Sequence, residues 1–477
     1  MCHSKRCGLE FFSSPANLRT PERPAGTLIE SVLGCPRVLM RTTVLVFLNA
    51  AWVLVGCGSQ DPGNRPPEAI GSEAPRGGSP PAAGKDFAND PGSAVILAAQ
   101  AIDKSPEGAV YREAVAALDA RDVQRAVALR RTLEGHPQYG ALAEAIDALG
   151  LAKSGKLEDA LRAAEQLSRI PAMQAESLLI AGEVFQTQGN WSQALGAFHR
   201  ALELHPNNVR AHRWLGALYY DLGAMQLATV HLGKVAELDP TDYRALRLCG
   251  LIRYDYEQFA ESADDYRRAL ERSPPGPVAD EIRLGLAAAL RQQHRVDEAF
   301  AALESCPESV AVLTERAMCF EAAGQVDKAL DLARRAVDQA PHDAQANLIL
   351  GRLHLSLHHA ADAVGPLRIA LAGDPTDHKR HYLLGRALLQ AGETEEGQAE
   401  LERSAPLRDM FLRLADLHLK ANANPYDVGV RVQLGELAEK LGRLQNARTW
   451  YRAALGLDPE NRQATEAIAR LESLTKP

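Results

Sequence analysis

The amino-acid sequence predicts an all-α protein, a superhelical solenoid of about ten helical hairpins stacked in sequence order. The first observation is a recurrence, because Pro206 is followed by Pro240 and Pro274 at intervals of 34 residues. The second is composition: the apolar residues are mostly Ala and Leu, and aromatic residues make up only 5% of the chain. Alternating runs of Val, Ile and Thr are missing, so a large sheet is not expected.

Each 34-residue unit carries small or apolar residues at fixed positions, numbered here so that Pro206 is position 32. Positions 4, 7, 8 and 11 form one apolar stripe at helical spacing, and positions 20, 24 and 27 form a second. Small residues at positions 8 and 20 predict a close approach of the two helices. Phe198 at position 24 is expected to fill the gap beside Ala201, and Pro206 to end the second helix.

Glycine returns at position 15, where it predicts a left-handed cap that ends the first helix of the unit. The glycines at this position are Gly189, Gly223, Gly324, Gly392 and Gly442.

This spacing and residue set resemble the tetratricopeptide repeat family, which implies a right-handed superhelix with a concave face. The repeats with the full pattern cover 175–208, 209–242, 243–276, 310–343, 344–377 and 428–461; weaker copies cover 107–140 and 141–174, and a shortened one covers about 280–307. A unit from 378 breaks off near Pro406. We therefore divide the body into an array at 93–406, an interrupting helix and loop at 407–427, and a last repeat with a capping helix at 428–477.

The front of the chain has a different character. Residues 40–57 join a basic start to a short apolar core and end in Leu-Val-Gly-Cys, which resembles the signal sequence of bacterial lipoproteins. The resemblance implies that Cys57 becomes the lipidated first residue, that Met40 is the true start, and that 1–39 is a mis-assigned extension. The alternative is a plain membrane-spanning helix over 42–60. Residues 58–92 are rich in Gly, Pro and Ser and predict a disordered tether.

The family resemblance also implies which residues face the groove, at positions 2, 5, 9, 12 and 13. Two adjacent units repeat Arg, Arg, Tyr, Asp there, and an Arg fork suits a carboxylate or phosphate. The alternative is that these Arg are solvated residues with local ion pairs. The predicted partner-binding residues are Arg210, Arg213, Tyr220, Arg244, Arg247, Tyr254, Arg352, Tyr382 and Arg386.

Several functions are not expected from this sequence. The net charge is −8, which argues against a general nucleic-acid binder. Motifs for phosphate loops, nucleophile elbows and paired cysteine ligands are missing, so we expect neither an enzyme nor a cofactor. His354 and His358 have a metal-binding spacing, but His358 falls in the expected turn, so no metal site is predicted. Cys249, Cys306 and Cys319 are expected to be small buried residues.

The predicted function is thus a non-catalytic scaffold or adaptor that is anchored in the bacterial cell envelope through the lipid on Cys57. Its groove would bind a protein or peptide partner with an acidic segment. The alternative is a groove for a glycan or another acidic polymer or small ligand, with Tyr220 and Tyr254 as stacking platforms.

Overall fold

The computed structural model describes residues 104–137 and 139–474. Within these ranges the chain forms twenty-one α-helices and no strand, which confirms the all-α prediction. None of these helices is both long enough and apolar enough to cross a lipid bilayer. The predictions for the extension at 1–39, the signal at 40–57 and the tether at 58–92 lie outside the described residues.

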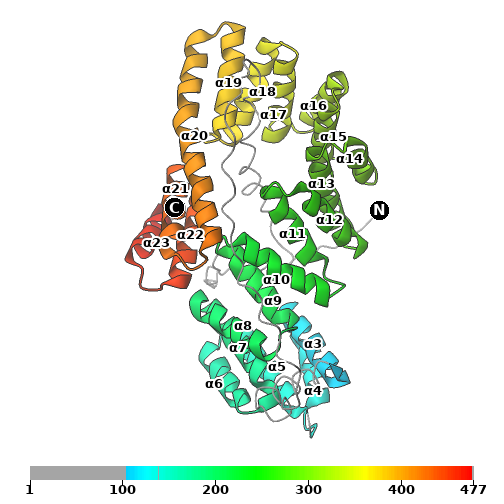
Figure 1. The fold of residues 1–477 in the computed structure, drawn as a ribbon, viewed down its shortest axis with the longest axis vertical. Coiled ribbons are helices and arrows are strands. Elements are labelled where there is room, and N and C mark those ends of the chain that lie inside the picture. The colour runs from blue at the N-terminus through cyan, green and yellow to red at the C-terminus, as the bar shows by residue number, and fades with distance from the viewer. Residues whose placement is uncertain (1–103, 138, 475–477) are drawn as a thin grey trace, which may run out of the picture.

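Ten antiparallel helical hairpins follow one another along the chain (Figure 1), in agreement with the predicted solenoid. The first helices are α3 (Pro106–Asp119), α5 (Gly140–Lys153), α7 (Gln174–Thr187), α9 (Val209–Asp221), α11 (Tyr243–Asp255), α13 (Gly276–Gln292), α15 (Val310–Ala322), α17 (Ala344–Ser356), α19 (His378–Ala391) and α21 (Val428–Lys440). The second helices are α4 (Val123–Leu133), α6 (Leu157–Ser168), α8 (Trp191–Leu204), α10 (Met225–Leu238), α12 (Phe259–Glu271), α14 (Val296–Leu303), α16 (Val326–Gln339), α18 (Ala360–Gly373), α20 (Thr394–Ala423) and α22 (Leu444–Leu457). A 3-10 turn (Pro171–Met173) precedes α7, and α23 (Arg462–Leu474) covers the last hairpin.

The two helices of a hairpin meet where the sequence places its small residues. A Cβ added to Gly182 would lie 2.5 Å from the ring of Phe198, and one added to Gly435 would lie 2.5 Å from the ring of Tyr451. Such distances are shorter than any packed interior allows. Position 8 is therefore small because the side chain at position 24 occupies the space above it, as the repeat pattern predicts.

The turn between the two helices has a left-handed residue at position 15 in every hairpin. The five predicted glycines have φ between 66° and 93°, which confirms their capping role. Gly155 takes the same place in the second hairpin, with φ 81°. Four hairpins use a residue with a side chain there, at an energetic cost. These residues are Arg121, Glu257, His294 and His358, with φ between 59° and 62°.

The segment 407–427 continues the second helix of the ninth hairpin. Residues 407–423 belong to α20, a helix of 30 residues with Pro406 in its interior, and a loop leads from Asn424 to α21. This extra length carries the chain from the ninth hairpin back toward the fourth (Figure 1).

The array closes on itself, which a simple stack of repeats does not do. Helix α22 contacts α8, and α20 contacts α10 (Figure 1). A Cβ added to Gly456 of α22 would lie 2.6 Å from the ring of Trp191 in α8. The largest apolar cluster accordingly includes Ala453 beside residues of α7 to α15, and Cys249, Cys306 and Cys319 are buried within it as free thiols. That arrangement confirms the predicted role of these cysteines as small buried residues.

Candidate binding groove

A cavity of about 650 Å³ opens between the first helices of the N-terminal hairpins. Residues of α3, α5, α7 and α9 line it, together with the turns that follow α8 and α10. Two residues predicted from the repeat positions, Arg210 and Arg213, are part of this lining. We call this cavity the N-terminal groove.

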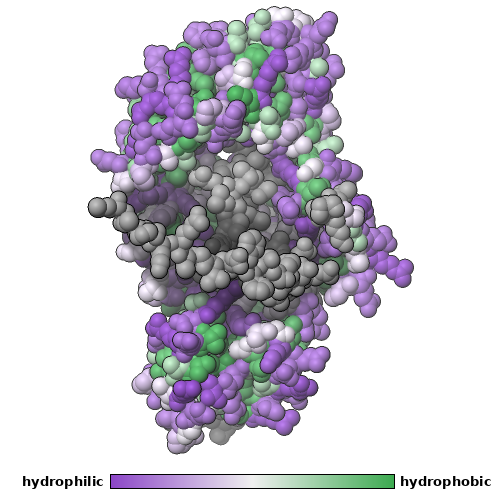
Figure 2. All heavy atoms as spheres, turned by 180° about the vertical axis from the view of Figure 1, so that it is seen from behind, coloured by the Kyte–Doolittle hydropathy of each residue, from purple (hydrophilic) through white to green (hydrophobic). Residues whose placement is uncertain are grey.

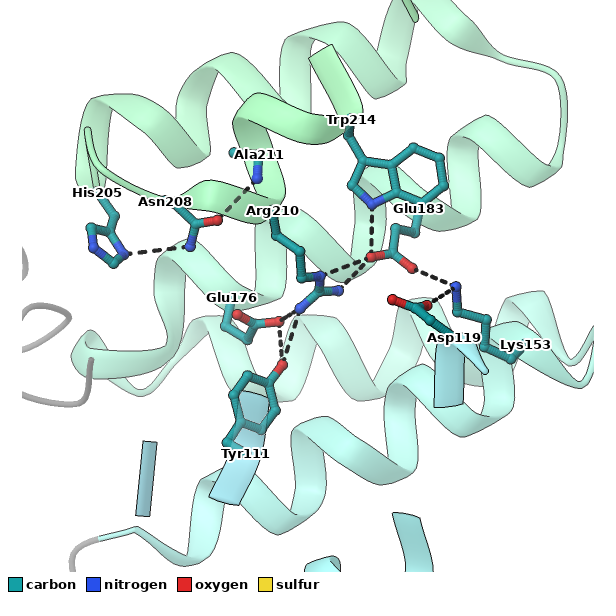
Figure 3. Close-up of polar contacts among 10 residues, drawn as sticks. All are labelled: Tyr111, Asp119, Lys153, Glu176, Glu183, His205, Asn208, Arg210, Ala211 and Trp214. Carbon is teal, nitrogen blue, oxygen red and sulfur yellow. Dashed lines mark hydrogen bonds and ion pairs between the residues drawn. The ribbon is translucent and has the colours of Figure 1, made fainter. Parts of the chain in front are cut away.

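Arg210 is the centre of a charge network in the wall of the N-terminal groove (Figure 3). Its guanidinium binds Glu176 and Glu183 of α7, and donates to the hydroxyl of Tyr111 of α3 at 3.2 Å. The indole of Trp214 also donates to Glu183, at 3.0 Å. Residues of three first helices are therefore joined through one side chain that is only 15% exposed.

A second cation completes this network. The ammonium of Lys153 lies 2.7 Å from Asp119 and 3.5 Å from Glu183 (Figure 3). Burial by itself would raise the pKa of the Glu183 carboxyl, but the charges of Arg210 and Lys153 outweigh it and lower this pKa to about 2. Glu183 is thus ionised at any physiological pH, and Arg210 is held in place by two carboxylates.

Arg213 lies about one helical turn further along α9, and its side chain is more exposed than that of Arg210. It forms ion pairs with Asp242 at 2.8 Å and with Asp239 at 3.4 Å, and its side chain is 21% exposed. Its Nε is buried and has no hydrogen-bond partner within the described residues. A buried N–H without an acceptor is costly, and this atom is closed to solvent, so a ligand oxygen reaches it only after the side chain rotates.

The polar residues of the turn before α9 shape the rim. The side chain of Asn208 caps α9 by accepting from the backbone N–H of Ala211 at 2.9 Å (Figure 3). Asn207 lines the same rim and is exposed.

The other predicted residues lie elsewhere along the array. Tyr220 is only 7% exposed, and Tyr254 is half-buried with its ring against Phe259. Arg244 lies over the ring of Tyr243 at 5.2 Å, and Arg247 is paired with Glu281 at 3.1 Å.

Farther on, Arg352 is paired with Glu321, and Tyr382 and Arg386 are exposed neighbours whose groups lie 5.8 Å apart. The structure thus brings Arg210 and Arg213 to one cavity and distributes the remaining residues over separate places.

Sequence reasoning missed the partners that neutralise Arg210. Glu176 and Glu183 occupy positions 2 and 9 of the unit 175–208, and Tyr111 occupies position 5 of the unit 107–140. The same rule that selected Arg210 would have found all three, if it had been applied to acidic residues and to the weaker repeat.

The rest of the described surface is mainly polar. Figure 2 views the protein from the side opposite to Figure 1. It shows hydrophilic residues over most of the described part of that side, with apolar residues between them. Val123, Val230 and Leu419 are among the exposed large apolar side chains and lie on different helices. Single exposed apolar residues are normal in soluble domains and need no special explanation.

Comparison with known proteins identifies the repeats. One model of the tetratricopeptide repeat matches residues 179–243, 250–309, 300–344 and 314–378, and a second model of this repeat matches 428–461. Among curated proteins, BBSome complex member BBS4 of Bos taurus is 23% identical over 348 residues, covering 68% of this chain and 60% of the relative. Anaphase-promoting complex subunit 7 of Homo sapiens is 24% identical over 285 residues, covering 58% of this chain and 47% of the relative. The chain thus spans less than two thirds of either relative.

Among solved structures, a human IFIT1 dimer with PPP-AAAA is similar in fold. The similarity covers 77% of this chain and 94% of that chain, with 16% identity and a TM-score of 0.34.

The 34-residue period, the left-handed turns and the matched repeats agree with one another, and the chain belongs to the tetratricopeptide repeat family.

Proposed function

We propose that this protein is a non-catalytic protein–protein interaction scaffold that binds an extended peptide segment of a partner in the N-terminal groove. The family membership supports this function, as do two relatives whose names describe them as a BBSome complex member and an anaphase-promoting complex subunit. Both names denote parts of multi-protein assemblies.

The observation that carries the proposal is the cavity of about 650 Å³ between consecutive first helices. This volume falls within the range of clefts that hold a ligand of several residues or a small molecule. Its wall is fixed by the ion network of Arg210, so little side-chain freedom has to be lost when a ligand binds.

Arg213 supplies the polar anchor in this proposal. Its unpartnered Nε–H can donate to a backbone carbonyl or carboxylate of the peptide after a small rotation of the side chain. A carboxylate of the peptide would form the stronger hydrogen bond with the guanidinium, but it has to displace Asp239 or Asp242, which already pair with Arg213. The continuation of the peptide would pass toward Arg244 and Arg247.

The alternative, a glycan in the groove, requires open aromatic faces. Tyr220 is buried and Tyr254 is half-buried, so neither ring offers a full stacking surface. These positions favour the peptide over the glycan.

In-cell photo-crosslinking tests the groove. A photo-reactive residue replaces Asn207 on the rim, and a second variant carries it at Glu165, an exposed position on α6 outside the groove. The expected result is one discrete protein adduct from position 207, and its loss when Arg213→Met is added. Identical adducts from both positions, or an adduct that Arg213→Met leaves unchanged, contradict the proposed groove.

The localisation is part of the proposal and depends on sequence alone. The lipoprotein-type signal at 40–57 supports a membrane anchor on Cys57, with the array facing the periplasm or the exterior. Mass spectrometry of the mature N-terminus is the test. A diacylated or triacylated Cys57 is the expected result, and an intact, unacylated peptide that spans Cys57 overturns the anchor.

A further inference from the structure

We propose that the turn of the eighth hairpin is a binding site for a divalent transition-metal ion such as Zn²⁺, formed by His354, His359 and Asp362. One potential ligand atom from each of these three side chains lies within 4.8 Å of the other two. The site is separate from the N-terminal groove, because it belongs to the hairpin of α17 and α18.

The left-handed turn brings the three residues together. Helix α17 ends at Ser356, His358 has φ 61°, and His359 is the N-cap of α18. The chain therefore reverses at His358 and returns past the last turn of α17. The rings of His354 and His359 have centroids 6.1 Å apart as a result.

His354 provides an independent indication of a missing ligand. Its side chain is 6% exposed, and its Nδ1 is buried without a hydrogen-bond partner within the described residues. The buried His381 differs, because its two nitrogens contact Glu400 at 2.5 Å and the carbonyl of Pro375 at 2.9 Å. Nδ1 of the half-buried His378 is a second imidazole nitrogen without a partner, but no other metal-ligating group of the described residues is grouped with it. A buried imidazole nitrogen without a partner is expensive unless something occupies it.

The two exposed members of the site are not held in place by hydrogen bonds of their side chains. His359 holds the N-cap position of α18 but makes no side-chain capping bond. Asp362 lies in the first turn of α18, and neither it nor His359 forms a side-chain hydrogen bond or ion pair in the described part of the chain. Both side chains are therefore free to rotate toward an ion.

Two imidazole nitrogens and one carboxylate oxygen suit a borderline divalent ion better than Ca²⁺ or Mg²⁺, which prefer oxygen ligands alone. Ligand atoms at about 2.1 Å from a tetrahedral zinc ion lie about 3.4 Å apart, so the three ligand atoms approach one another by up to about 1.4 Å on binding. Three protein ligands leave at least one coordination position open for water or a partner's side chain.

Calorimetric titration of the tag-free full chain with Zn²⁺ tests the site, with visible absorption of Co²⁺ as a second readout of the ligand field. The wild-type chain is expected to bind one ion saturably at this turn. His359→Ala and Asp362→Asn are expected to weaken this binding by roughly tenfold or more each. Both replace exposed side chains, so the helical circular dichroism is expected to stay unchanged.

The matched control is His358→Ala, which removes an exposed imidazole from the same turn but outside the proposed ligand set. It is expected to bind Zn²⁺ as the wild type does. The site is ruled out by a wild-type chain without saturable binding, by unchanged affinity in His359→Ala, or by an equal loss in His358→Ala.

Discussion

The guanidinium of Arg431 donates two hydrogen bonds to the backbone carbonyl of Leu222, at 2.7 Å and 3.2 Å, across 209 positions of sequence. It also donates to the carbonyls of Ala421, Asn424 and Asp427, at 2.7 to 3.0 Å. Leu222 is the C-cap of α9, and Ala421 lies in the last turn of α20. Arg431 therefore neutralises the negative ends of two helices that belong to distant repeats, and it holds the array closed.

Replacing Arg431 is expected to open this closure. Arg431→Met keeps much of the side-chain volume but leaves the carbonyls of Leu222, Ala421, Asn424 and Asp427 without their donor. Because Arg431 is 0% exposed, we expect a loss of roughly 3 kcal/mol in the free energy of unfolding. Small-angle scattering is expected to show a larger radius of gyration. Arg413→Met, at an exposed site on α20, is the control, and an equal change in both variants would falsify the role of Arg431.

Gly223 and Gly189 provide a matched pair that tests the contact between the turn after α9 and Trp450 of α22. Both are position-15 glycines with φ of 74° and 78°, but a Cβ would lie 2.7 Å from Trp450 only at Gly223, and would meet nothing within 4 Å at Gly189. Gly189→Ala is expected to cost about 1 kcal/mol through backbone strain alone. Gly223→Ala is expected to cost about 1 to 2 kcal/mol more, because the Trp450 ring must move. Denaturant titration measures both, and equal losses would show that Trp450 does not restrain the turn.

The ion network of Arg210 is expected to behave as a buried unit. Arg210→Met leaves Glu176 and Glu183 as buried carboxylates without their main partner, so a loss of about 3 to 5 kcal/mol is expected. The triple change Arg210→Met, Glu176→Gln and Glu183→Gln removes the uncompensated charges and is expected to recover part of this loss. Thermal unfolding compares the variants, and a triple variant no more stable than Arg210→Met contradicts this account.

His294 has φ 60° at position 15, where other hairpins use glycine. His294→Gly is expected to stabilise the fold by about 1 kcal/mol, because glycine adopts this conformation without a Cβ clash. Ala323→Gly is the control, since Ala323 has φ −80° and gains nothing from glycine. Chemical denaturation should give a higher free energy of unfolding for His294→Gly and a lower one for Ala323→Gly. A destabilised His294→Gly would mean that the imidazole contributes more stability than the backbone strain costs.

A histidine cluster on α8, α9 and α10 predicts acid sensitivity. Burial, with the neighbouring His212 and His199, lowers the pKa of His231 to about 4. The unfolded chain, in which the pKa of a histidine is about 6.5, therefore binds more protons between these two values, and stability falls as pH drops from about 6.5 to 4. Asp221 has the opposite effect on the pH dependence of stability, because burial raises its pKa to about 8 and the folded chain then binds more protons than the unfolded chain.

The variant His231→Gln separates the two effects. Between pH 7 and pH 4.5 the wild type is expected to lose more free energy of unfolding than the variant does, by on the order of 1 to 3 kcal/mol. Urea titrations at both pH values measure it. A difference that does not change with pH would show that His231 titrates in the folded protein as it does in the unfolded chain.

The sequence by itself determined the hairpin and its repetition. The spacing of Gly182, Phe198 and Pro206 encodes contacts within one 34-residue unit, and such local contacts are the same wherever the unit occurs. The left-handed turns that contain glycine followed for the same reason, whereas those at Arg121, Glu257, His294 and His358 appeared only in the structure. The lipid anchor on Cys57, which depends on residues outside the described ranges, stays a prediction.

Only the tertiary structure decided how the repeats use their polar residues. Arg210 looked available from its position, but its charge is taken up by acidic residues of the preceding unit, which a single-unit pattern does not reveal. The contact of Arg431 with Leu222 and the meeting of His354 with His359 likewise depend on where the backbone turns and how the array curves. The physical reason is that curvature is summed over many helix–helix angles, whereas the repeat pattern specifies one hairpin at a time.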